Sequence, residues 1–450
     1  MNRNTAKPKI KTQIPGPQTK KWVNFHMKFA AETTYHKHFV WDRKAPAIGP
    51  YCTDPDGNIF LDFASHVASN PLGYNHPKLT KVAQKLAAIE PDRYAGTDFI
   101  SAYGKDPKKM QIPTPSHLHH KIAEITRQLG FNTSFFINSG AEAVENAIKL
   151  CFMARPKAKH AIVFQKAFHG RTLGALSMSS SKSIHNDGIP QIPNVIRLPY
   201  LFCKGDTCHF YKPGSDPTQS ISALISKKPK KGQIKPEDVA YILLEPIQGE
   251  GGYNFPNPMW LKEIQETAKK FEIPLICDEI QTGMGRTGTW WASQQLGLEP
   301  DLITIGKALR IGAVAGKKEL FPKVQGRLGS TWGEGNAIAS AMGYLTIDII
   351  QKENLLENTQ KLGQYFLQEL KTFKKQHKSI EDVRGMGLLI VMEFETAAQR
   401  DKVANACLKK GLLLIGCGEK ALRFLPPLNV KKREIDQALE ILSTCLKPLP

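Results

Sequence analysis

Two short apolar runs, each followed by an ionisable residue, constrain this chain most. The first run, Pro274 to Cys277, leads into Asp278, and the second, Leu302 to Ile305, is followed after one glycine by Lys307. Residues 291–298 between them are predicted to form a short helix. Such a strand–helix–strand unit belongs to an α/β sheet. Because ligands of open α/β sheets bind at the carboxyl ends of the strands, we expect Asp278 and Lys307 to face one crevice.

A lysine and an acid at neighbouring strand ends fit one kind of catalysis. A lysine amine can form a Schiff base with a carbonyl group, and a carboxylate can pair with a protonated pyridine nitrogen. Pyridoxal phosphate chemistry requires both groups. Each residue also has a plain structural interpretation, with Lys307 as a surface lysine after a buried strand and Asp278 as a helix cap. The further motifs favour the chemical interpretation.

Length and composition set the class of the protein. At 450 residues, the chain is longer than one hydrophobic core usually holds, so two or three domains are expected. With 41% hydrophobic residues and no apolar stretch long enough to span a bilayer, we expect a soluble globular protein. The eight cysteines are scattered, which fits a reduced, cytoplasmic setting. Cys203 and Cys208 flank a short turn, where we expect two free thiols rather than a metal site.

The net charge of +20 favours anionic partners. However, the lysines are spread along the chain in short runs such as Lys227 to Lys231, and the aromatic and basic repeat of an RNA-binding module does not occur. We therefore interpret the charge mainly as solvated surface. The first 13 residues are rich in lysine and lack acids and an apolar segment, so a disordered start is expected rather than a transit peptide.

Apolar strands alternate with helices over most of the chain. This pattern predicts an α/β fold with a large, mostly parallel, doubly wound sheet and a smaller α+β domain. We expect an N-terminal arm and small-domain segment in residues 1–65, a large cofactor-binding domain in 66–334 and a C-terminal small domain in 335–450. Besides the two runs above, the predicted strands are 51–52, 59–61, 135–137, 161–164, 241–244, 387–394 and 411–415, and the later helices are 337–373 and 432–446.

Two motifs follow predicted strands and suit ligand binding. Ser139-Gly140-Ala141 opens a helix, whose first turn offers unpaired backbone N–H groups to an anion such as a phosphate. Ser139 could cap this helix or contact the anion. In the second motif, Phe168 could stack on a planar ring and Arg171 could hold a carboxylate by a two-pronged contact. A core phenylalanine and a surface arginine are the plain alternative.

Charged residues in unusual settings mark two further segments. Glu245 and Glu250 lie in a glycine-rich loop that follows another predicted strand. Arg423 lies between apolar residues, and an arginine so placed is usually paired or binds a ligand because burying it alone is costly. A salt bridge in the core is the alternative for Arg423.

Together, these motifs resemble those of the class III aminotransferases, a family with the aspartate-aminotransferase type of pyridoxal phosphate fold, fold type I. The similarity runs in order from about residue 14 to the end of the chain. Ala141 departs from the family, which often has threonine there, but backbone N–H groups make most of that phosphate contact. The six motifs that carry the resemblance are Ser139 to Ala143, Phe168 to Thr172, Glu245 to Gly252, Asp278 to Gly283, Gly306 to Ala308 and Leu422 to Pro427.

The resemblance implies pyridoxal 5'-phosphate as the cofactor and gives each motif a role. Lys307 would hold the cofactor covalently and then move a proton between substrate and cofactor. Asp278 would keep the pyridine nitrogen protonated. Thr331 resembles a threonine that reaches the phosphate bound by the partner subunit, which implies a homodimer with shared active sites. The other implied cofactor contacts are Gln281 at the ring hydroxyl, Phe168 at the ring face, and Gly140 and Ala141, beside Ser139, at the phosphate.

Arg171, Glu250 and Arg423 are implied to select the substrates. Arg171 would hold the remote carboxylate of the amine donor and of 2-oxoglutarate. Arg423 would be neutralised by Glu250 for the amine donor and released for the keto acid. This arrangement favours transfer of the terminal amine of a diamino acid to 2-oxoglutarate, which gives a semialdehyde and glutamate. Three stretches look most like lysine 6-aminotransferases: Phe63 to Gly73, Ser330 to Gly333 and Gly418 to Phe424. Ornithine and 4-aminobutyrate remain open as alternative donors.

Two other functions stay open at this point. An amino-acid racemase of the same fold would use the same Lys307 and Asp278, and glutamate formation dependent on 2-oxoglutarate would distinguish it. A basic nucleic-acid-binding protein that has lost catalysis is disfavoured by the intact Lys307, Asp278 and Gln281. Salt-sensitive DNA binding without cofactor absorbance would support that reading. We expect neither a metal site nor a membrane association.

Overall fold

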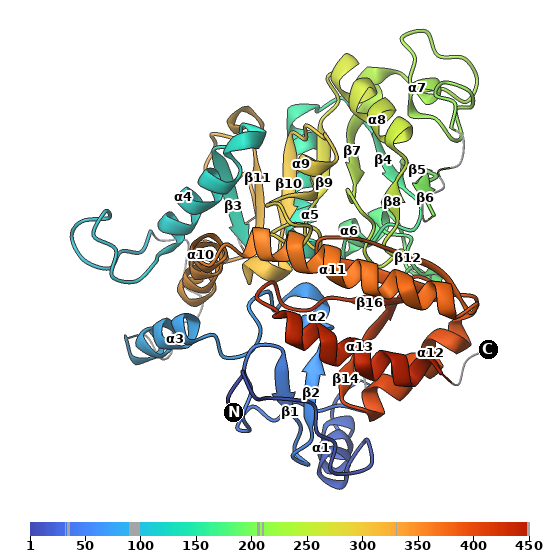
Figure 1. The fold of residues 1–450 in the computed structure, drawn as a ribbon. Coiled ribbons are helices and arrows are strands. Elements are labelled where there is room, and N and C mark those ends of the chain that lie inside the picture. The colour runs from blue at the N-terminus through green and yellow to red at the C-terminus, as the bar shows by residue number, and fades with distance from the viewer. Residues whose placement is uncertain are drawn as a thin grey trace. The chain divides into compact units, whose positions relative to one another are not determined.

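The computed structural model describes residues 1–31, 33, 37–89, 100–204, 208, 211–329 and 331–447. The chain forms two compact units (Figure 1). One unit, which we call the sheet unit, consists of Lys81–Leu356. The other, which we call the terminal unit, combines Met1–Thr80 with Glu357–Pro450 and so joins the two ends of the chain.

A seven-stranded sheet forms the centre of the sheet unit. All of its strands run parallel except β11, which is antiparallel to both of its neighbours. The predicted mostly parallel sheet is therefore confirmed, although β11 and β5 are not among the strands predicted from the sequence. In spatial order the strands are β3 (Thr133–Ile137), β11 (Gly312–Gly316), β10 (Leu302–Ile305), β9 (Leu275–Asp278), β7 (Val239–Leu244), β4 (His160–Phe164) and β5 (Val195–Leu198).

Helices cover both faces of this sheet. On β10, Ile303 and Ile305 pack into one apolar layer, whereas Leu302 packs into another, because successive side chains of a strand point to opposite faces. The doubly wound arrangement is thereby confirmed. The first layer includes α4 (Pro115–Ile125), α7 (Ile221–Leu224), α8 (Pro258–Lys270) and α10 (Ala337–Lys352), and the second includes α5 (Gly140–Ala154) and α6 (Leu173–Met178).

Two predicted helices differ in extent from those observed. The helix expected at 291–298 is only α9 (Ala292–Gln295), because Trp291 is extended and Gly297 has a left-handed φ of 68°. The helical stretch expected at 337–373 is divided into α10 and α11 (Leu355–Gln376), with Asn354 at φ 50° in the break. The remaining elements before α10 are α3 (Pro77–Ile89) and the short pair β6 (Phe202–Cys203) and β8 (Phe255–Pro256).

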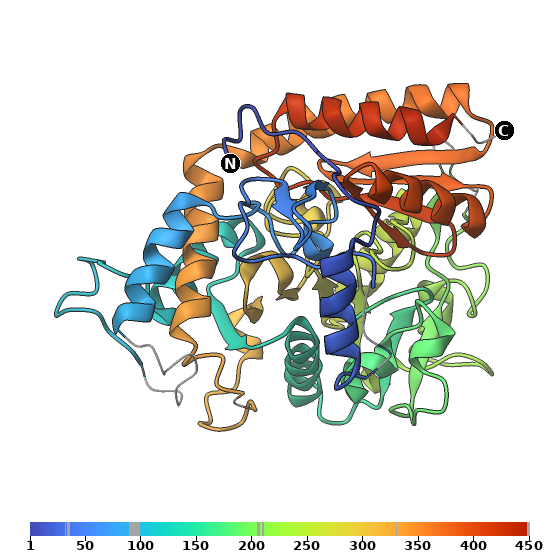
Figure 2. The ribbon, with the colours of Figure 1, turned by 90° about the horizontal axis from the view of Figure 1, so that it is seen from below.

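Two small sheets and the terminal helices make up the terminal unit. The predicted hairpin at 51–61 is confirmed as β1 (Tyr51–Thr53) and β2 (Ile59–Asp62), and β14 (Leu412–Leu413) adds to it in parallel. The closing helix α13 (Lys432–Leu446) has the predicted bounds. It lies beside α11 in both views (Figure 1, Figure 2). The antiparallel second sheet consists of β12 (Ile380–Met386), β13 (Leu389–Phe394), β16 (Ala421–Phe424) and β15 (Ile415–Cys417), and the other helices are α1 (Pro17–Met27), α2 (Ser65–Ala68) and α12 (Ala397–Lys409).

The expected disordered start is wrong. The Arg3 guanidinium pairs with Glu434 at 2.8 Å, and the backbone of Lys9 exchanges two hydrogen bonds with Ile59, each of 2.9 Å. Both partners belong to the terminal unit, so distant parts of the chain hold the first residues in place. Composition alone carries no information about such partners.

The prediction of two free thiols at Cys203 and Cys208 is also wrong. The two cysteines form a disulfide, with their Cα atoms 4.3 Å apart. Their separation of five residues in sequence permits such a bond but does not reveal it. The other six cysteines are buried and lie outside any disulfide.

Candidate active site

The carboxyl ends of the parallel strands surround a pocket of about 240 Å³ in the sheet unit. Segments that follow β3, β4, β7, β9 and β10 all contribute to it. The predicted crevice at this edge of the sheet is therefore present. The described residues that line it are Gly140, Ala141, Phe168, His169, Gly170, Glu245, Asp278, Ile280, Gln281, Thr282 and Lys307.

Asp278 is the last residue of β9, and 4% of it is exposed. Its Oδ2 lies 2.7 Å from Nδ1 of His169. Its Oδ1 accepts hydrogen bonds from Oγ1 of Thr304 at 2.9 Å and from the backbone N of Ile280 at 3.1 Å. Both oxygens thus have partners, which fixes the orientation of the carboxylate at the pocket wall.

His169 is a residue of the site that the sequence analysis did not assign. Its ring is buried, and its backbone N donates to Oγ of Ser179 at 2.8 Å. Nδ1 faces Asp278, whereas Nε2 has no hydrogen-bond partner among the described residues. The only signal in the sequence is the position of His169 beside Phe168 in a motif at a strand end. The contact with Asp278, more than a hundred residues away, is a property of the fold.

Lys307 follows β10 and begins a short 3-10 turn. Its φ of 35° lies in the left-handed region, which is uncommon for a residue with a side chain. Backbone strain of this kind costs about 1–3 kcal/mol and collects at functional sites. Lys307 is half-buried and lines the pocket, so the interpretation of a lysine on the open surface does not hold.

Ser139 caps α5. Its Oγ accepts from the backbone N of Glu142 at 3.2 Å, and the Glu142 carboxylate accepts in return from the backbone N of Ser139 at 2.8 Å. This capping box directs the first turn of the helix, with Gly140 and Ala141, to the pocket. The positive end of the helix dipole therefore faces the cavity, where it favours an anion.

Small residues allow the segments around this part of the pocket to pack closely. A Cβ added to Gly140 would lie 2.9 Å from Cδ1 of Ile280. Gly170 has a φ of 137°, and a Cβ there would lie 2.6 Å from Cβ of Ala141. Any larger side chain at Gly170 would therefore displace the first turn of α5.

Comparison with known proteins identifies the family. The sequence profile of the family described as "Aminotransferase class-III" matches residues 32–446. This chain belongs to the class-III aminotransferases. The acetylornithine aminotransferase of Archaeoglobus fulgidus is 32% identical over 431 residues, which cover 94% of this chain and 99% of that protein. The alanine/serine racemase of Pyrococcus horikoshii is 30% identical, with coverage of 98% and 93%.

Solved structures agree with this family. The lysine aminotransferase from M. tuberculosis superposes with a TM-score of 0.81 at 26% identity, and the match covers 95% of this chain and 98% of that one. The resemblance inferred from the motifs is thus confirmed, together with fold type I.

Class-III aminotransferases use pyridoxal 5'-phosphate, and the pocket fits this cofactor. The cofactor carries a carbonyl carbon, a ring nitrogen and a phosphate. The pocket offers a lysine amine, a buried carboxylate with fixed orientation and a helix N-terminus bordered by small residues. Among the described residues, no group of three or more metal-ligating side chains could hold a metal ion, and no helix is both long and apolar enough to cross a bilayer.

Of the other predicted site residues of this aminotransferase, some line the pocket and others lie outside its described lining. Gln281 lines the pocket, and its Oε1 accepts from the Tyr253 hydroxyl at 2.9 Å. Arg171 is exposed, and its Nη2 donates to Nε2 of His185 at 2.9 Å. The described lining of the pocket does not include Ser139, Arg171, Glu250 or Thr331.

Backbone contacts locate Thr331 and Arg423 in the fold. Thr331 is exposed, and its carbonyl oxygen accepts from the side-chain amide of Asn138. Arg423 lies in the terminal unit on β16, paired with Val391 on one side and Ile415 on the other, and is 4% exposed. Ser330, part of one stretch similar to lysine 6-aminotransferases, lies outside the described residues.

Glu245 is a buried acid in the wall of the pocket. Its two oxygens accept from the backbone N of Phe168 at 2.9 Å and of Gly249 at 2.8 Å. Burial raises the pKa of Glu245 to about 7; Asp278 adds to this effect, whereas His169 opposes it. Glu245 is not among the functional residues predicted from the sequence. In the structure, its carboxyl joins the Phe168 motif to the glycine-rich loop.

The raised pKa of Glu245 predicts a pH-dependent stability. The folded chain holds this proton more tightly than the unfolded chain, whose pKa is near 4.5, so the stabilisation is complete below 4.5 and lost as pH rises through about 7. Glu245→Gln carries no titratable proton. The free energy of unfolding of the variant, relative to that of the wild type, should therefore increase by about 3 kcal/mol from pH 4.5 to pH 8. Urea unfolding at both pH values measures it, and parallel pH profiles would refute the shift.

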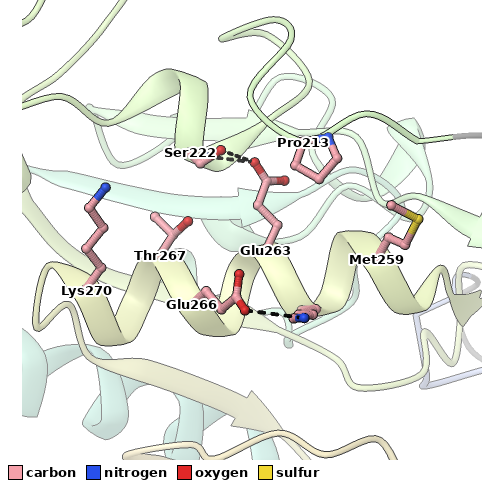
Figure 3. Close-up of a pocket in the computed structure, with 8 residues that line it drawn as sticks. Pro213, Ser222, Met259, Glu263, Glu266, Thr267 and Lys270 are labelled. Carbon is pink, nitrogen blue, oxygen red and sulfur yellow. Dashed lines mark hydrogen bonds and ion pairs between the residues drawn. The ribbon is translucent and has the colours of Figure 1, made fainter.

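A larger cavity of about 420 Å³ lies along α8 (Figure 3). Its buried acid, Glu263, accepts from the hydroxyls of Tyr211, Ser220 and Ser222. In Figure 3 the Glu263 carboxylate points to Ser222. These bonds hold α7 and the segment before it against α8, which assigns Glu263 to stability rather than chemistry.

Glu263→Ala should destabilise this aminotransferase by about 3–5 kcal/mol, because the hydroxyls would lose a shared, charged acceptor. Chemical denaturation measures the loss. Glu266→Ala is the matched control, since Glu266 lines the same cavity on the same helix but pairs with Lys262 on the exposed surface at 3.7 Å. Equal stability of the two variants would contradict the structural role of Glu263.

Proposed function

We propose that this enzyme transfers the terminal amine of an ω-amino acid, L-lysine in first place, to 2-oxoglutarate, with a semialdehyde and glutamate as products. The observation that carries this proposal is the convergence of the Lys307 amine and the Asp278 carboxylate on one pocket beside the Phe168–Arg171 motif. The names of similar proteins support a donor of this class: they include acetylornithine aminotransferase and lysine aminotransferase.

In the proposed reaction, Lys307, Asp278 and His169 would each have a separate role. Bound pyridoxal 5'-phosphate supplies an electron sink for a substrate carbon that loses a proton. Lys307 would hold the cofactor through its amine and carry the proton to and from the substrate. Asp278 would keep a proton on the ring nitrogen, and His169 would hold the carboxylate in place by its contact with Oδ2.

The remaining cofactor contacts would fix the ring and the phosphate. Phe168 would stack on the ring face, and Gln281, oriented by Tyr253, would meet the ring hydroxyl. Gly140 and Ala141 would bind the phosphate through backbone N–H groups, with Ser139 as the cap that presents them.

An ω-aminotransferase must accept two substrates whose carboxylates lie at different distances from the reacting carbon. Arg171 would hold the remote carboxylate of both. Arg423 would bind the carboxylate that adjoins the keto group of 2-oxoglutarate, and Glu250 would neutralise Arg423 when the ω-amine donor is bound. The burial of Arg423 supports this role, because a buried arginine requires an anionic or polar partner.

Opposite effects on the two half-reactions are expected for Glu250→Ala and Arg423→Ala. Without Glu250, Arg423 would stay unmasked, so α-amino donors such as glutamate should gain relative to lysine. Without Arg423, the 2-oxoglutarate half-reaction should slow by about 10- to 100-fold more than the lysine half-reaction. Single-turnover rates measure both, with exposed Glu237→Ala as the control. Equal losses in both half-reactions for both variants would make the two residues a structural pair.

A donor panel tests the reaction itself. Purified enzyme with 2-oxoglutarate should form glutamate from lysine faster than from ornithine, 4-aminobutyrate or alanine. Glutamate from ornithine or 4-aminobutyrate alone would keep the ω-donor class and reject lysine. Racemisation of alanine without glutamate formation would show that the enzyme is a racemase and not a transaminase. The similar Pyrococcus horikoshii protein, named an alanine/serine racemase, is the reason to test this alternative.

We also propose a homodimer in which Thr331 serves the phosphate site of the partner subunit. Exposed apolar side chains of the sheet unit support an interface, among them Ile100, Val324 and Trp332, the neighbour of Thr331. Sedimentation velocity at micromolar concentration tests the dimer, and a monomer with full activity would reject it.

A further inference from the structure

Arg171 is held by a histidine that the proposed reaction does not use. Its Nη2 lies 2.9 Å from Nε2 of His185. An arginine side chain offers only donors, so Nε2 must accept, and the imidazole must be neutral with its proton on Nδ1. A protonated ring would turn an N–H towards the guanidinium, and the contact would become a repulsion between two cations.

The segment that carries His185 is anchored near the pocket. The amide of Asn186 donates to the carbonyl oxygen of Ser179, just after α6, at 2.9 Å. The His185 ring also meets the ring of Phe168 edge-on, with centroids 6.0 Å apart and planes at 71°. Since Phe168 lines the pocket, His185 connects the pocket wall with Arg171.

The charges around His185 favour its neutral form. Burial, Arg171 and Lys182 lower the pKa of His185, whereas Glu250 raises it. Nδ1 is buried and has no hydrogen-bond partner among the described residues, so no carboxylate there stabilises an imidazolium. The net effect keeps the ring neutral at pH 7 and leaves Nε2 as the acceptor for Arg171.

We propose that neutral His185 is the positioning residue for Arg171. The imidazole holds the Arg171 guanidinium in place for the substrate carboxylate, and protonation of His185 releases the guanidinium. This inference rests on the proposed function, because it takes Arg171 as the carboxylate anchor. His185 would then set the lower pH limit for binding of both the amine donor and 2-oxoglutarate, without a part in the proton transfers.

Binding of glutarate to the cofactor-loaded enzyme tests this proposal. Glutarate carries the two carboxylates of 2-oxoglutarate but no keto group, and calorimetry gives its Kd from about pH 6 to about pH 8.5, where both carboxylates are ionised. The wild-type Kd should rise as pH falls towards 6. His185→Gln keeps a hydrogen-bond acceptor that does not titrate. The Kd of this variant should therefore stay near the wild-type value at pH 8 and should not show the rise that the wild type shows as pH falls. His185→Phe keeps an aromatic ring at this position but has no hydrogen-bond acceptor. Its Kd for glutarate should be about 5- to 20-fold higher than the wild-type value at pH 8, and it should stay high at every pH.

Turnover separates positioning from catalysis. His185→Phe should raise KM for 2-oxoglutarate at nearly unchanged kcat. In single-turnover experiments without a keto acid, it should leave the half-reaction with 1,5-diaminopentane, a donor without a carboxylate, unaffected. His120→Gln, an exposed histidine on α4, controls for general effects of losing a histidine. If His185→Phe fails to fold, the pH profile of His185→Gln alone decides.

Arg171→Gln distinguishes the two levels of the proposal. If this variant binds glutarate like the wild type, Arg171 is not the anchor, and the proposed carboxylate role fails. If Arg171→Gln weakens binding but His185→Phe does not, the anchor stands and the positioning by His185 is wrong. A wild-type pH dependence that persists in His185→Gln overturns the inference as well.

Discussion

Lys307→Ala should abolish turnover while the enzyme stays folded. The amine of Lys307 is placed in the pocket by a strained turn after β10, and an alanine can neither hold the cofactor covalently nor carry a proton. Loss of the proton-transfer group alone typically costs a factor of about 10²–10⁴, and loss of the covalent attachment adds to this. Borohydride reduction of the wild type should fix the cofactor to the peptide that contains Lys307, whereas the variant should release it on denaturation.

Lys318→Ala is the matched control for this variant. Lys318 is an exposed lysine shortly after β11 in the same unit, so its loss should leave both turnover and fixation intact. Unfolding of Lys307→Ala at a temperature near that of the wild type would show that the fold survives. Full activity of Lys307→Ala, or cofactor fixed elsewhere after reduction, would remove Lys307 from the mechanism.

The second large effect is expected for Asp278→Asn, whose turnover should fall by roughly 30- to 5000-fold. A neutral amide cannot hold a proton on the ring nitrogen, and loss of such a charged partner costs about 2–5 kcal/mol of transition-state stabilisation. The substitution preserves the shape of the side chain, but its one oxygen can accept either from His169 or from Ile280, not from both. The loss therefore reports on the charge together with one backbone hydrogen bond, and not on side-chain volume.

Two measurements make the Asp278 result specific. Single-turnover rates of both half-reactions should fall together, because both need the protonated ring. Asp401→Asn, which removes an exposed carboxylate on α12, should leave them unchanged. Near-native rates for Asp278→Asn would show that another group is the partner of the ring nitrogen.

The chemistry at the strand ends was accessible from the sequence because it is local. An apolar run that leads into Asp278, and another that precedes Lys307, locate both the strands and the residues that follow them. Parallel strands then bring these residues to the same edge without further information. The capping of α5 by Ser139 is equally local, since its partner Glu142 lies three residues on.

The missed features all depend on contacts between distant residues. His169 and Glu245 belong to the pocket because the fold brings them to Asp278, and no spacing in the sequence encodes that proximity. β11 consists of small residues between two glycines, a composition that does not favour a strand, and its neighbours impose the strand conformation. The ordered N-terminus likewise depends on Glu434, near the opposite end of the chain.

The close approach of Gly170 to the first turn of α5 fixes the residue at one position of its motif. A Cβ at position 170 would lie 2.6 Å from Cβ and 2.9 Å from Cα of Ala141 and 3.0 Å from Cβ of Ala175, and the φ of 137° disfavours every residue with a side chain. Glycine is therefore required at 170 whichever residue occupies 141. A library that randomises both positions should recover glycine alone at 170.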